Sequence, residues 1–167
     1  NSSKVFERAN LKNAIHQFAP VDSPFIIKKF LDYWQPKRGI FIDSEIWPNL
    51  ICMASKRFDL INLNARISRK STASWAKLRS LINLLYNKFS HIYPCSKADM
   101  ARIKTLTDNK HVKYIGNIKY MADAPTCDAS KHKEYSTKLS GKKIVVAAST
   151  HPGEEDYVLN AMKPIFA

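Results

Sequence analysis

An acidic tripeptide, Asp43-Ser44-Glu45, directly follows the apolar run 40–42 and precedes Trp47-Pro48-Asn49. In parallel α/β sheets, ligands bind just beyond the carboxyl ends of the strands, so residues at this position are candidates for chemistry. A carboxylate there can act as a general acid or base at the mouth of a cleft. Alternatively, these acids cap the N-terminus of the next helix, a role that acidic side chains often fill. The residue types alone leave both functions open.

Two further candidate sites follow the next apolar runs. Arg66 and Ser68 come after the run 60–63, where a guanidinium and a hydroxyl can bind an anion, although Ser68 is equally suited to cap a helix. Lys119 follows the run 112–115, and a lysine beside an interdomain cleft can neutralise charge that develops on a leaving group. A surface lysine next to a turn has the same sequence signature.

The segment 149–155 places small hydroxyl residues, Pro-Gly and two glutamates after the apolar run 144–148. This order predicts a helix N-terminus whose free backbone N–H groups can bind an anion, and the same residues make an efficient helix cap. Both roles use the same backbone donors. The segment lacks the GxGxxG and GxxxxGK[ST] patterns, which excludes those cofactor sites. The three cysteines are far apart and have no metal-ligand spacing, so no metal site is predicted.

The elements that must position these residues alternate between strand and helix periodicity. Buried strands are predicted at 40–42, 60–63, 91–93, 112–115 and 144–148. Helices are predicted from Pro24 to Trp34, from Glu45 or Pro48 to Arg57, and at 74–89, 97–106 and 154–165. This alternation with short joints predicts an α/β fold, with a Rossmann-like parallel sheet and flanking helices.

Residues 121–141 interrupt the alternation, because they lack a sustained apolar run and are rich in Ala, Ser, Thr, Pro and Asp. We expect an interdomain linker there, with one short helix near 131–139. It would join an α/β domain (1–120) to the first βα unit of a second domain (142–167). Because the chain starts at Asn1 and stops inside an apolar run, we expect both ends to be cuts within a longer protein.

The positive charge of the chain is concentrated in its middle. The formal net charge is +13, and residues 46–121 hold 14 Lys and Arg against 3 Asp and Glu. Such a surplus predicts attraction to nucleic acid, acidic lipid or phosphorylated substrates. Nucleic-acid binding usually needs exposed aromatic platforms. Here five aromatics lie at helical spacing and are expected in the core, which argues against it: Phe25, Phe30, Trp34, Trp75 and Phe89.

Taken in order, five stretches of the chain resemble one family, the 3-deoxy-D-manno-octulosonic acid (Kdo) transferases of lipopolysaccharide synthesis. They are HQFAPVDSPFIIKKFL (16–31), IFIDSEIWPNLI (40–51), LNARIS (63–68), YIGNIKY (114–120) and AASTHPGEE (147–155). The E-x-W-P-N and S-T-H-x-G-E-E elements are specific. The resemblance implies a two-domain GT-B glycosyltransferase at the cytoplasmic face of the bacterial inner membrane. Such an enzyme transfers Kdo from CMP-Kdo to a lipid A precursor with inversion, using no cofactor and no metal.

Carried over motif by motif, the resemblance implies that Glu45 and Lys119 support the transition state. The motif that opens the second domain near the nucleotide sugar falls on Ser149, Thr150, His151, Gly153 and Glu154. Arg66 and Ser68 complete the predicted substrate-binding residues. The implied partners are CMP-Kdo, a phosphorylated lipid A precursor and an anionic membrane surface, with no nucleic acid.

The chain also departs from the family pattern. The family's general base is a glutamate in a Gly-rich motif upstream of these residues, next to an N-terminal membrane anchor, and most of the CMP-binding half lies downstream of Ala167. Asp43-Ser44 replaces the more usual Glu-Thr, and Tyr120 replaces Phe. We therefore expect the chain to be the middle of such an enzyme and to be inactive alone. The alternative is a non-catalytic α/β module that binds anions or lipid head groups.

Overall fold

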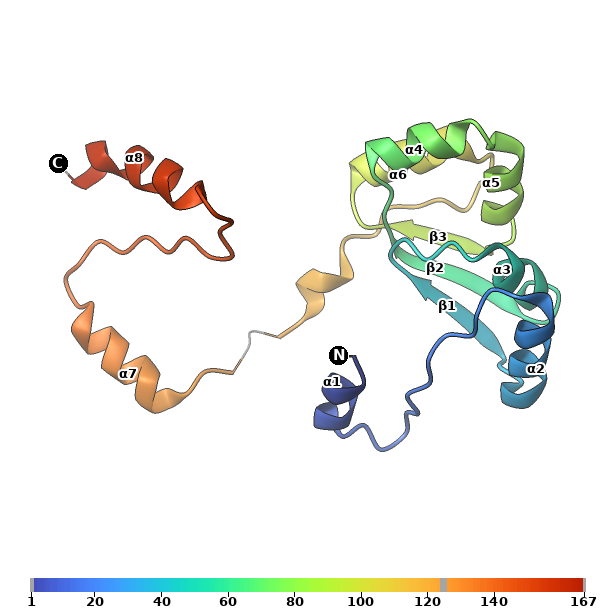
Figure 1. Cartoon of the computed structure of the whole chain (residues 1–167), viewed down its shortest axis with the longest axis horizontal. Coiled ribbons are helices and arrows are strands. Elements are labelled where there is room, and N and C mark those ends of the chain that lie inside the picture. Colours follow the sequence, from blue (N-terminus) through green and yellow to red (C-terminus); the bar gives the residue numbers. More distant parts are fainter. Residues whose placement is uncertain (1, 124–125, 167) are drawn as a thin grey trace. The chain divides into compact units, whose positions relative to one another are not determined.

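The computed structural model describes residues 2–123 and 126–166. The chain divides into two compact units, residues 1–122 (unit 1) and residues 123–167 (unit 2). Unit 1 contains a parallel sheet of three strands in the order β1 (Arg38–Ile42), β2 (Asp59–Ala65), β3 (His91–Pro94). In Figure 1 these strands lie side by side and point the same way. The predicted α/β class with a parallel sheet and flanking helices is confirmed.

Six α-helices of unit 1 accompany this sheet. They are α1 (Ser2–Ala9), α2 (Pro24–Trp34), α3 (Pro48–Ala54), α4 (Arg69–Ala76), α5 (Arg79–Tyr86) and α6 (Lys97–Leu106), followed by the 3-10 helix η1 (Ile118–Met121). Pro24 starts α2 because its fixed φ suits the first helical position, and Gln35 ends α2 in the left-handed conformation (φ 42°). Both α2 and α6 match the predicted ranges.

The hydrophobic core of unit 1 lies around β2 and β3. Helix α3 packs against β2, α6 packs against β3, and α5 contacts both helices. The fully buried side chains of this core include Leu60, Ile82, Leu85, Ile92, Ile103 and Leu106. Strand β1 is at the sheet edge, and its Ile40 and Ile42 remain exposed. Phe25 is 67% exposed, so its predicted place in the core is wrong, whereas Phe89 is buried as expected.

The strand predicted at 112–115 is reduced to one bridge. Val112 pairs in parallel with Ile92, through Ile92 N–H to His111 O (3.1 Å) and Lys113 N–H to Ile92 O (3.0 Å). The next bond of a parallel ladder would run from the N–H of residue 94, two positions after Ile92. Residue 94 is Pro94, which has no N–H to donate, so the ladder stops there.

The single helix predicted at 74–89 is also wrong, because two helices occupy this region. Ser68 caps α4, which begins at Arg69, and Leu78 leaves the helical conformation (φ −118°, ψ 41°) before α5. Helix α4 packs against α6, whereas α5 packs against α3 and α6, and the turn at Leu78 lets the chain reach both surfaces. Helix α3 ends at Ala54 rather than Arg57, and α1 was not predicted.

The described residues of unit 2 form two helices, α7 (Ala129–Lys138) and α8 (Glu154–Phe166). The strand predicted at 144–148 is not formed, although this is the most apolar run of the chain, and Val146 is 80% exposed. A β-strand needs a neighbouring strand to bond its backbone, and the described residues offer this segment none. Across residues 2–123 and 126–166, every helix is too short or too polar to cross a bilayer.

Candidate functional site

The loops that follow β1 and β2 are joined at the carboxyl edge of the sheet. Asn64 Nδ2 donates to Asp43 Oδ1 (2.6 Å), and the Asp43 N–H donates to Leu63 O (3.1 Å). Asp43 and Asn64 both adopt positive φ angles (61° and 56°), a conformation that Asp and Asn tolerate better than most residues. Ser44 Oγ donates to the backbone carbonyl of Arg66 (2.9 Å). These bonds fix the segment that carries Glu45 relative to the segment that carries Arg66.

Glu45 is exposed on this edge and is held by one neighbouring side chain. Trp47 Nε1 donates to Glu45 Oε2 (2.6 Å). Neither Glu45 nor Asp43 caps helix α3. That role belongs to Asp22, whose Oδ2 accepts from Asn49 N–H (3.1 Å) and whose Oδ1 accepts from Leu50 N–H (2.8 Å). The capping alternative for the acidic tripeptide is therefore wrong, and the Glu45 carboxylate faces solvent.

Arg66 and Ser68 lie on the segment that leads from β2 into α4. Ser68 Oγ accepts from Ser71 N–H (3.0 Å), so Ser68 serves as the helix cap that its sequence position allowed. Arg66 is exposed. Burial and the hydrogen bond to Asp99 raise the pKa of the Cys95 thiol, while the charge of Arg66 acts on that thiol to lower the pKa.

A buried carboxylate that the sequence reading missed holds these segments together. Asp99 Oδ1 accepts from the N–H of Ile67 (3.0 Å) and from Arg102 Nη2 (2.7 Å), and Asp99 Oδ2 accepts from Ser96 Oγ. Burial alone would raise the pKa of Asp99, but the hydrogen bonds from Ile67, Ser96 and Arg102 outweigh it and hold the pKa well below its usual range. Ser96-x-x-Asp99 is a capping-box pattern. The bonds between Asp99 and Ser96 could therefore have been found from the sequence, whereas the bond from Ile67 could not.

Lys119 belongs to the 3-10 helix η1, in the same unit as Glu45. Gly116 has φ 113°, a conformation that favours glycine, and Asn117 Oδ1 accepts from the Lys119 N–H (3.0 Å). The Lys119 side chain is exposed and makes no ion pair with any residue that the structure describes. Its ammonium group is therefore available to an anionic ligand.

In unit 2 the segment 149–155 forms the N-terminal cap of α8. The His151 N–H donates to Glu154 Oε2 (2.9 Å), and Thr150 Oγ1 donates to Glu155 Oε1 (2.6 Å), which lowers the pKa of Glu155. Ser149 and Gly153 have positive φ angles (58° and 91°). The Pro152-Gly153 pair, which was expected to open the helix, lies in the turn that precedes α8. The expected cap thus forms, and α8 starts at Glu154, the first residue of the predicted range 154–165.

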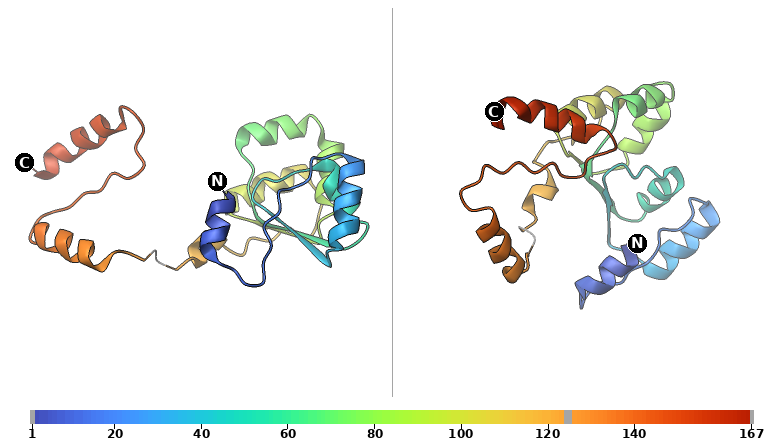
Figure 2. Two further views of the ribbon diagram at one scale, coloured as in Figure 1. Left: turned by 60° about the horizontal axis from the view of Figure 1, so that its bottom comes forward. Right: turned by 60° about the vertical axis from the view of Figure 1, so that its left-hand side comes forward.

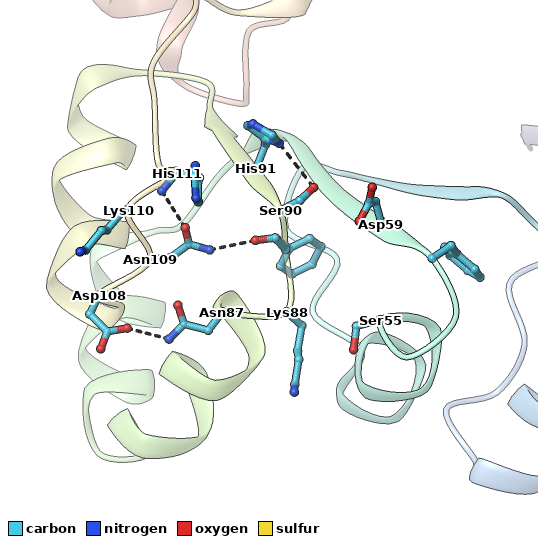
Figure 3. Close-up of a pocket in the computed structure, with 12 residues that line it drawn as sticks. Ser55, Asp59, Asn87, Lys88, Ser90, His91, Asp108, Asn109, Lys110 and His111 are labelled. Carbon is cyan, nitrogen blue, oxygen red and sulfur yellow. Dashed lines mark hydrogen bonds between the residues drawn. The ribbon is translucent and has the colours of Figure 1, made fainter.

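A cavity of about 540 Å³ lies at the opposite, amino-terminal edge of the sheet (Figure 3). The rings of His91 and His111 are 5.4 Å apart there. Asn87 Nδ2 donates to Asp108 Oδ1 (2.6 Å), and Asn109 Nδ2 donates to Phe89 O (2.9 Å). These polar groups bond one another and brace the loop after α6. None of the predicted site residues lines this cavity, and ligands of parallel sheets bind at the other edge.

The structure thus brings Glu45, Arg66 and Ser68 to loops at one sheet edge, with Lys119 in the same unit. Ser149, Thr150, His151, Gly153 and Glu154 form the separate cap in unit 2. Within residues 2–123 and 126–166, no group of three His, Cys, Asp or Glu side chains is placed to hold a metal ion. Sequence reasoning missed Asp22, Asn64 and Asp99, which orient the site loops.

Comparison with known proteins identifies the family. The family model for 3-deoxy-D-manno-octulosonic-acid transferases (kdotransferases) matches residues 1–122. A 3-deoxy-D-manno-octulosonic acid transferase of Rickettsia felis is 36% identical over 163 residues, which are 98% of this chain and 35% of the relative. A probable mitochondrial one of Arabidopsis thaliana is 36% identical over 152 residues (87% and 34%). One of Haemophilus influenzae is 32% identical over 160 residues (93% and 37%).

The chain spans about a third of the length of these curated relatives. The family model nevertheless covers the whole of unit 1, which carries Glu45, Arg66, Ser68 and Lys119. The resemblance seen in the sequence motifs is therefore confirmed, and the chain belongs to the 3-deoxy-D-manno-octulosonic acid transferase family.

Proposed function

We propose that this chain is part of a glycosyltransferase that transfers Kdo from CMP-Kdo to a phosphorylated lipid A precursor in lipopolysaccharide core synthesis. The observation that carries the proposal is the family match across residues 1–122, all of unit 1. The relatives named as Kdo transferases extend this likeness through unit 2. The complete enzyme would have the two-domain GT-B architecture, with residues 1–120 in the acceptor domain, 121–141 as the linker and 142–167 opening the donor domain.

The proposed reaction breaks the bond between the anomeric carbon of Kdo and the phosphate oxygen of CMP. An acceptor hydroxyl oxygen bonds to that carbon from the opposite face, with inversion, and gives its proton to a general base outside these residues. Positive charge develops on the sugar in such a transition state, as in other glycosyl transfers. The exposed carboxylate of Glu45 supports this charge, because it is not consumed by helix capping. Lys119 neutralises the leaving phosphate.

Substrate binding is proposed for the remaining candidate residues. Arg66 presents a guanidinium at the carboxyl edge of the sheet, where it suits the phosphate of the acceptor. In unit 2 the capped N-terminus of α8 suits the nucleotide-sugar phosphate. We propose that the enzyme works at the cytoplasmic face of the bacterial inner membrane, on an anionic membrane surface, with CMP-Kdo as substrate and without cofactor, metal or nucleic acid.

A chimaera tests the proposed function. Residues 1–167 replace the matching 163-residue region of the Rickettsia felis relative, and transfer of Kdo from CMP-Kdo to a lipid A precursor is measured. We expect turnover in the chimaera, and a loss on the order of 10²–10³ in kcat after Glu45→Gln or Lys119→Met. Glu7→Gln and Lys113→Met, which alter exposed residues away from the site loops, are the matched controls and keep the rate.

Two outcomes contradict the proposal. One is a folded chimaera, judged by circular dichroism, that shows no transfer. The other is full turnover after both Glu45→Gln and Lys119→Met, combined with weaker acceptor binding, which would favour the non-catalytic binding module. The chain alone is expected to show no transfer, since the proposed base and most of the donor site lie outside it.

A further inference from the structure

Helices α4 and α5 carry an unusual concentration of unopposed positive charge. No Asp or Glu lies between Asp59 and Asp99 in the sequence. Within this interval the exposed cations around the two helices are Arg66, Arg69, Lys70, Lys77, Arg79 and Lys88. None of these six forms an ion pair with a residue that the structure describes. Asp108 lies within electrostatic reach of Arg79, but its carboxylate is already bonded to Asn87.

The same two helices expose apolar side chains between these cations. Leu78, Leu81 and Leu84 are 56%, 41% and 48% exposed, and we call them the leucine patch. Leu85, which neighbours Leu81 one turn along the helix, and Ile82 are fully buried in the core. The apolar surface of α5 therefore extends from the core to Leu81 and Leu84, which the described residues of unit 1 leave exposed. Figures 1 and 2 show α4 and α5 (green) at the outer edge of that unit.

Exposed leucines flanked by lysine and arginine suit one kind of partner particularly well. In an anionic bilayer, leucines insert at the boundary between head groups and acyl chains, and cations bind the lipid phosphates. Nucleic acid would satisfy the cations but would leave the leucines in water, and its usual aromatic platforms are missing from the patch. A wholly apolar protein partner would leave the cations without counter-charges.

We propose that the surface formed by the leucine patch and its flanking cations docks this protein on a bilayer of anionic phospholipid. This inference rests on the proposed function, in which the enzyme works at a membrane, and it names the surface of the chain that contacts the lipid. It also affects how the enzyme would reach its acceptor. Arg66 lies on the short segment that connects the carboxyl end of β2 to the start of α4. Docking through α4 and α5 therefore brings the candidate acceptor site to the lipid surface.

Vesicle flotation of the 167-residue chain tests the docking surface without any sugar donor or acceptor. We expect binding to phosphatidylcholine vesicles containing one third phosphatidylglycerol, and at least tenfold weaker binding to phosphatidylcholine alone or at high salt. Lys70→Glu with Lys77→Glu is expected to weaken binding by more than about tenfold. Leu81→Ser with Leu84→Ser should weaken it by about tenfold, because the leucines no longer insert.

The matched controls alter equally exposed residues elsewhere in the chain. Leu11→Ser with Leu159→Ser removes two leucines, and Lys131→Glu with Lys133→Glu reverses two charges in α7. Both control variants should bind anionic vesicles as the unaltered chain does. Circular dichroism shows whether each variant keeps its helix content, which substitutions at exposed positions should preserve.

A second measurement reports directly from the leucine patch. In a chain with Trp34→Phe, Trp47→Phe, Trp75→Phe and Leu81→Trp, the sole tryptophan lies in the leucine patch, and brominated acyl chains should quench its fluorescence. Absence of this quenching, or leucine variants that bind anionic vesicles normally, overturns the proposal. Tight RNA binding that ignores the leucine substitutions assigns the surface to nucleic acid instead. Because no transfer is measured, failure of Kdo transfer in the chimaera leaves these results unaffected.

Discussion

The two units of this chain use apolar sequence in opposite ways. In unit 1 the run around Ile92 becomes strand β3 and pairs with β2, and the Ile92 side chain is completely buried. In unit 2 the run 144–148 is more apolar, yet it forms no strand among the described residues, and Val146 is 80% exposed. Hydrophobicity is therefore not sufficient for a strand, because backbone N–H and C=O groups also need a neighbouring strand.

Long-range bonds of carboxylates to helices and loops show the same contrast, although Ser68 and Ser96 cap α4 and α6 of unit 1 locally. In unit 1, α3 is capped by Asp22, which lies 27 residues before Asn49, and Asp99 of α6 bonds the backbone of Ile67. In unit 2 the caps are local: Asp128 caps α7, and Glu154 bonds the N–H of His151. Unit 1 is thus held by contacts between distant segments, whereas unit 2 is held mostly by contacts between near neighbours.

The largest expected effect comes from removing a buried side chain of unit 1. Ile92→Ala should lower the free energy of unfolding by about 3–4 kcal/mol, because it removes apolar contacts and leaves a cavity. Urea unfolding followed by tryptophan fluorescence measures this, since Trp34, Trp47 and Trp75 all belong to unit 1.

The same substitution in unit 2 is the control. Ile144 is exposed, so Ile144→Ala should change the free energy of unfolding by less than about 0.5 kcal/mol. Circular dichroism and hydrogen exchange extend the measurement to unit 2, which has no tryptophan. Similar losses in both variants would show that the run 144–148 is packed as firmly as β3, and the contrast between the units would fail.

The contrast between local and long-range contacts also explains which elements were predicted correctly from the sequence. Helices α2 and α6 were predicted with their observed ranges, because helical spacing of apolar residues and, for α2, Ser23-Pro24 at its start are signals carried by neighbouring residues. The strand at 112–115 was not predicted correctly, since its length depends on Pro94 in a different strand. The turn at Leu78 likewise depends on which surfaces α4 and α5 must cover.

The sequence predicted the candidate site residues themselves, but it did not predict the residues that hydrogen-bond to the site loops and orient them. Glu45 and Lys119 were found from motifs and from their positions after apolar runs. Asp22 was overlooked because it caps α3 from 27 positions before Asn49, and no local pattern connects it to that helix. The bond between Asn64 and Asp43 joins residues 21 positions apart, and no local pattern indicates it.

The next prediction concerns Asp99, whose bonds connect α6 to the residue after β2. Asp99→Asn should lower the free energy of unfolding by about 2–3 kcal/mol at neutral pH, because hydrogen bonds to a charged carboxylate are lost. The folded-state pKa of Asp99 lies below its unfolded value near 3.9. Its contribution to stability is therefore complete above about pH 5 and is lost as the pH falls towards the folded-state pKa.

Unfolding curves between pH 7 and pH 2.5 check this sign. The unaltered chain should lose stability over the acidic part of the range, and Asp99→Asn should flatten that loss. Asp59→Asn is the control, because the Asp59 side chain is exposed and its carboxylate forms no hydrogen bond or ion pair with other described residues. An equal pH slope in the unaltered chain and in Asp99→Asn would contradict the role given to this carboxylate.

The smallest expected effect separates long-range from local capping. Asp22→Ala should lower the free energy of unfolding of unit 1 by about 1–2 kcal/mol, because two N–H groups of α3 lose their acceptor. Asp128→Ala removes an equivalent two-bond cap from α7, but it should leave the tryptophan-detected transition unchanged and reduce only the helix content. Ser23→Ala should have almost no effect, since that side chain makes no capping bond. If Ser23→Ala destabilised unit 1 as much as Asp22→Ala, local sequence would set the start of these helices, and the difference between the units would be one of degree.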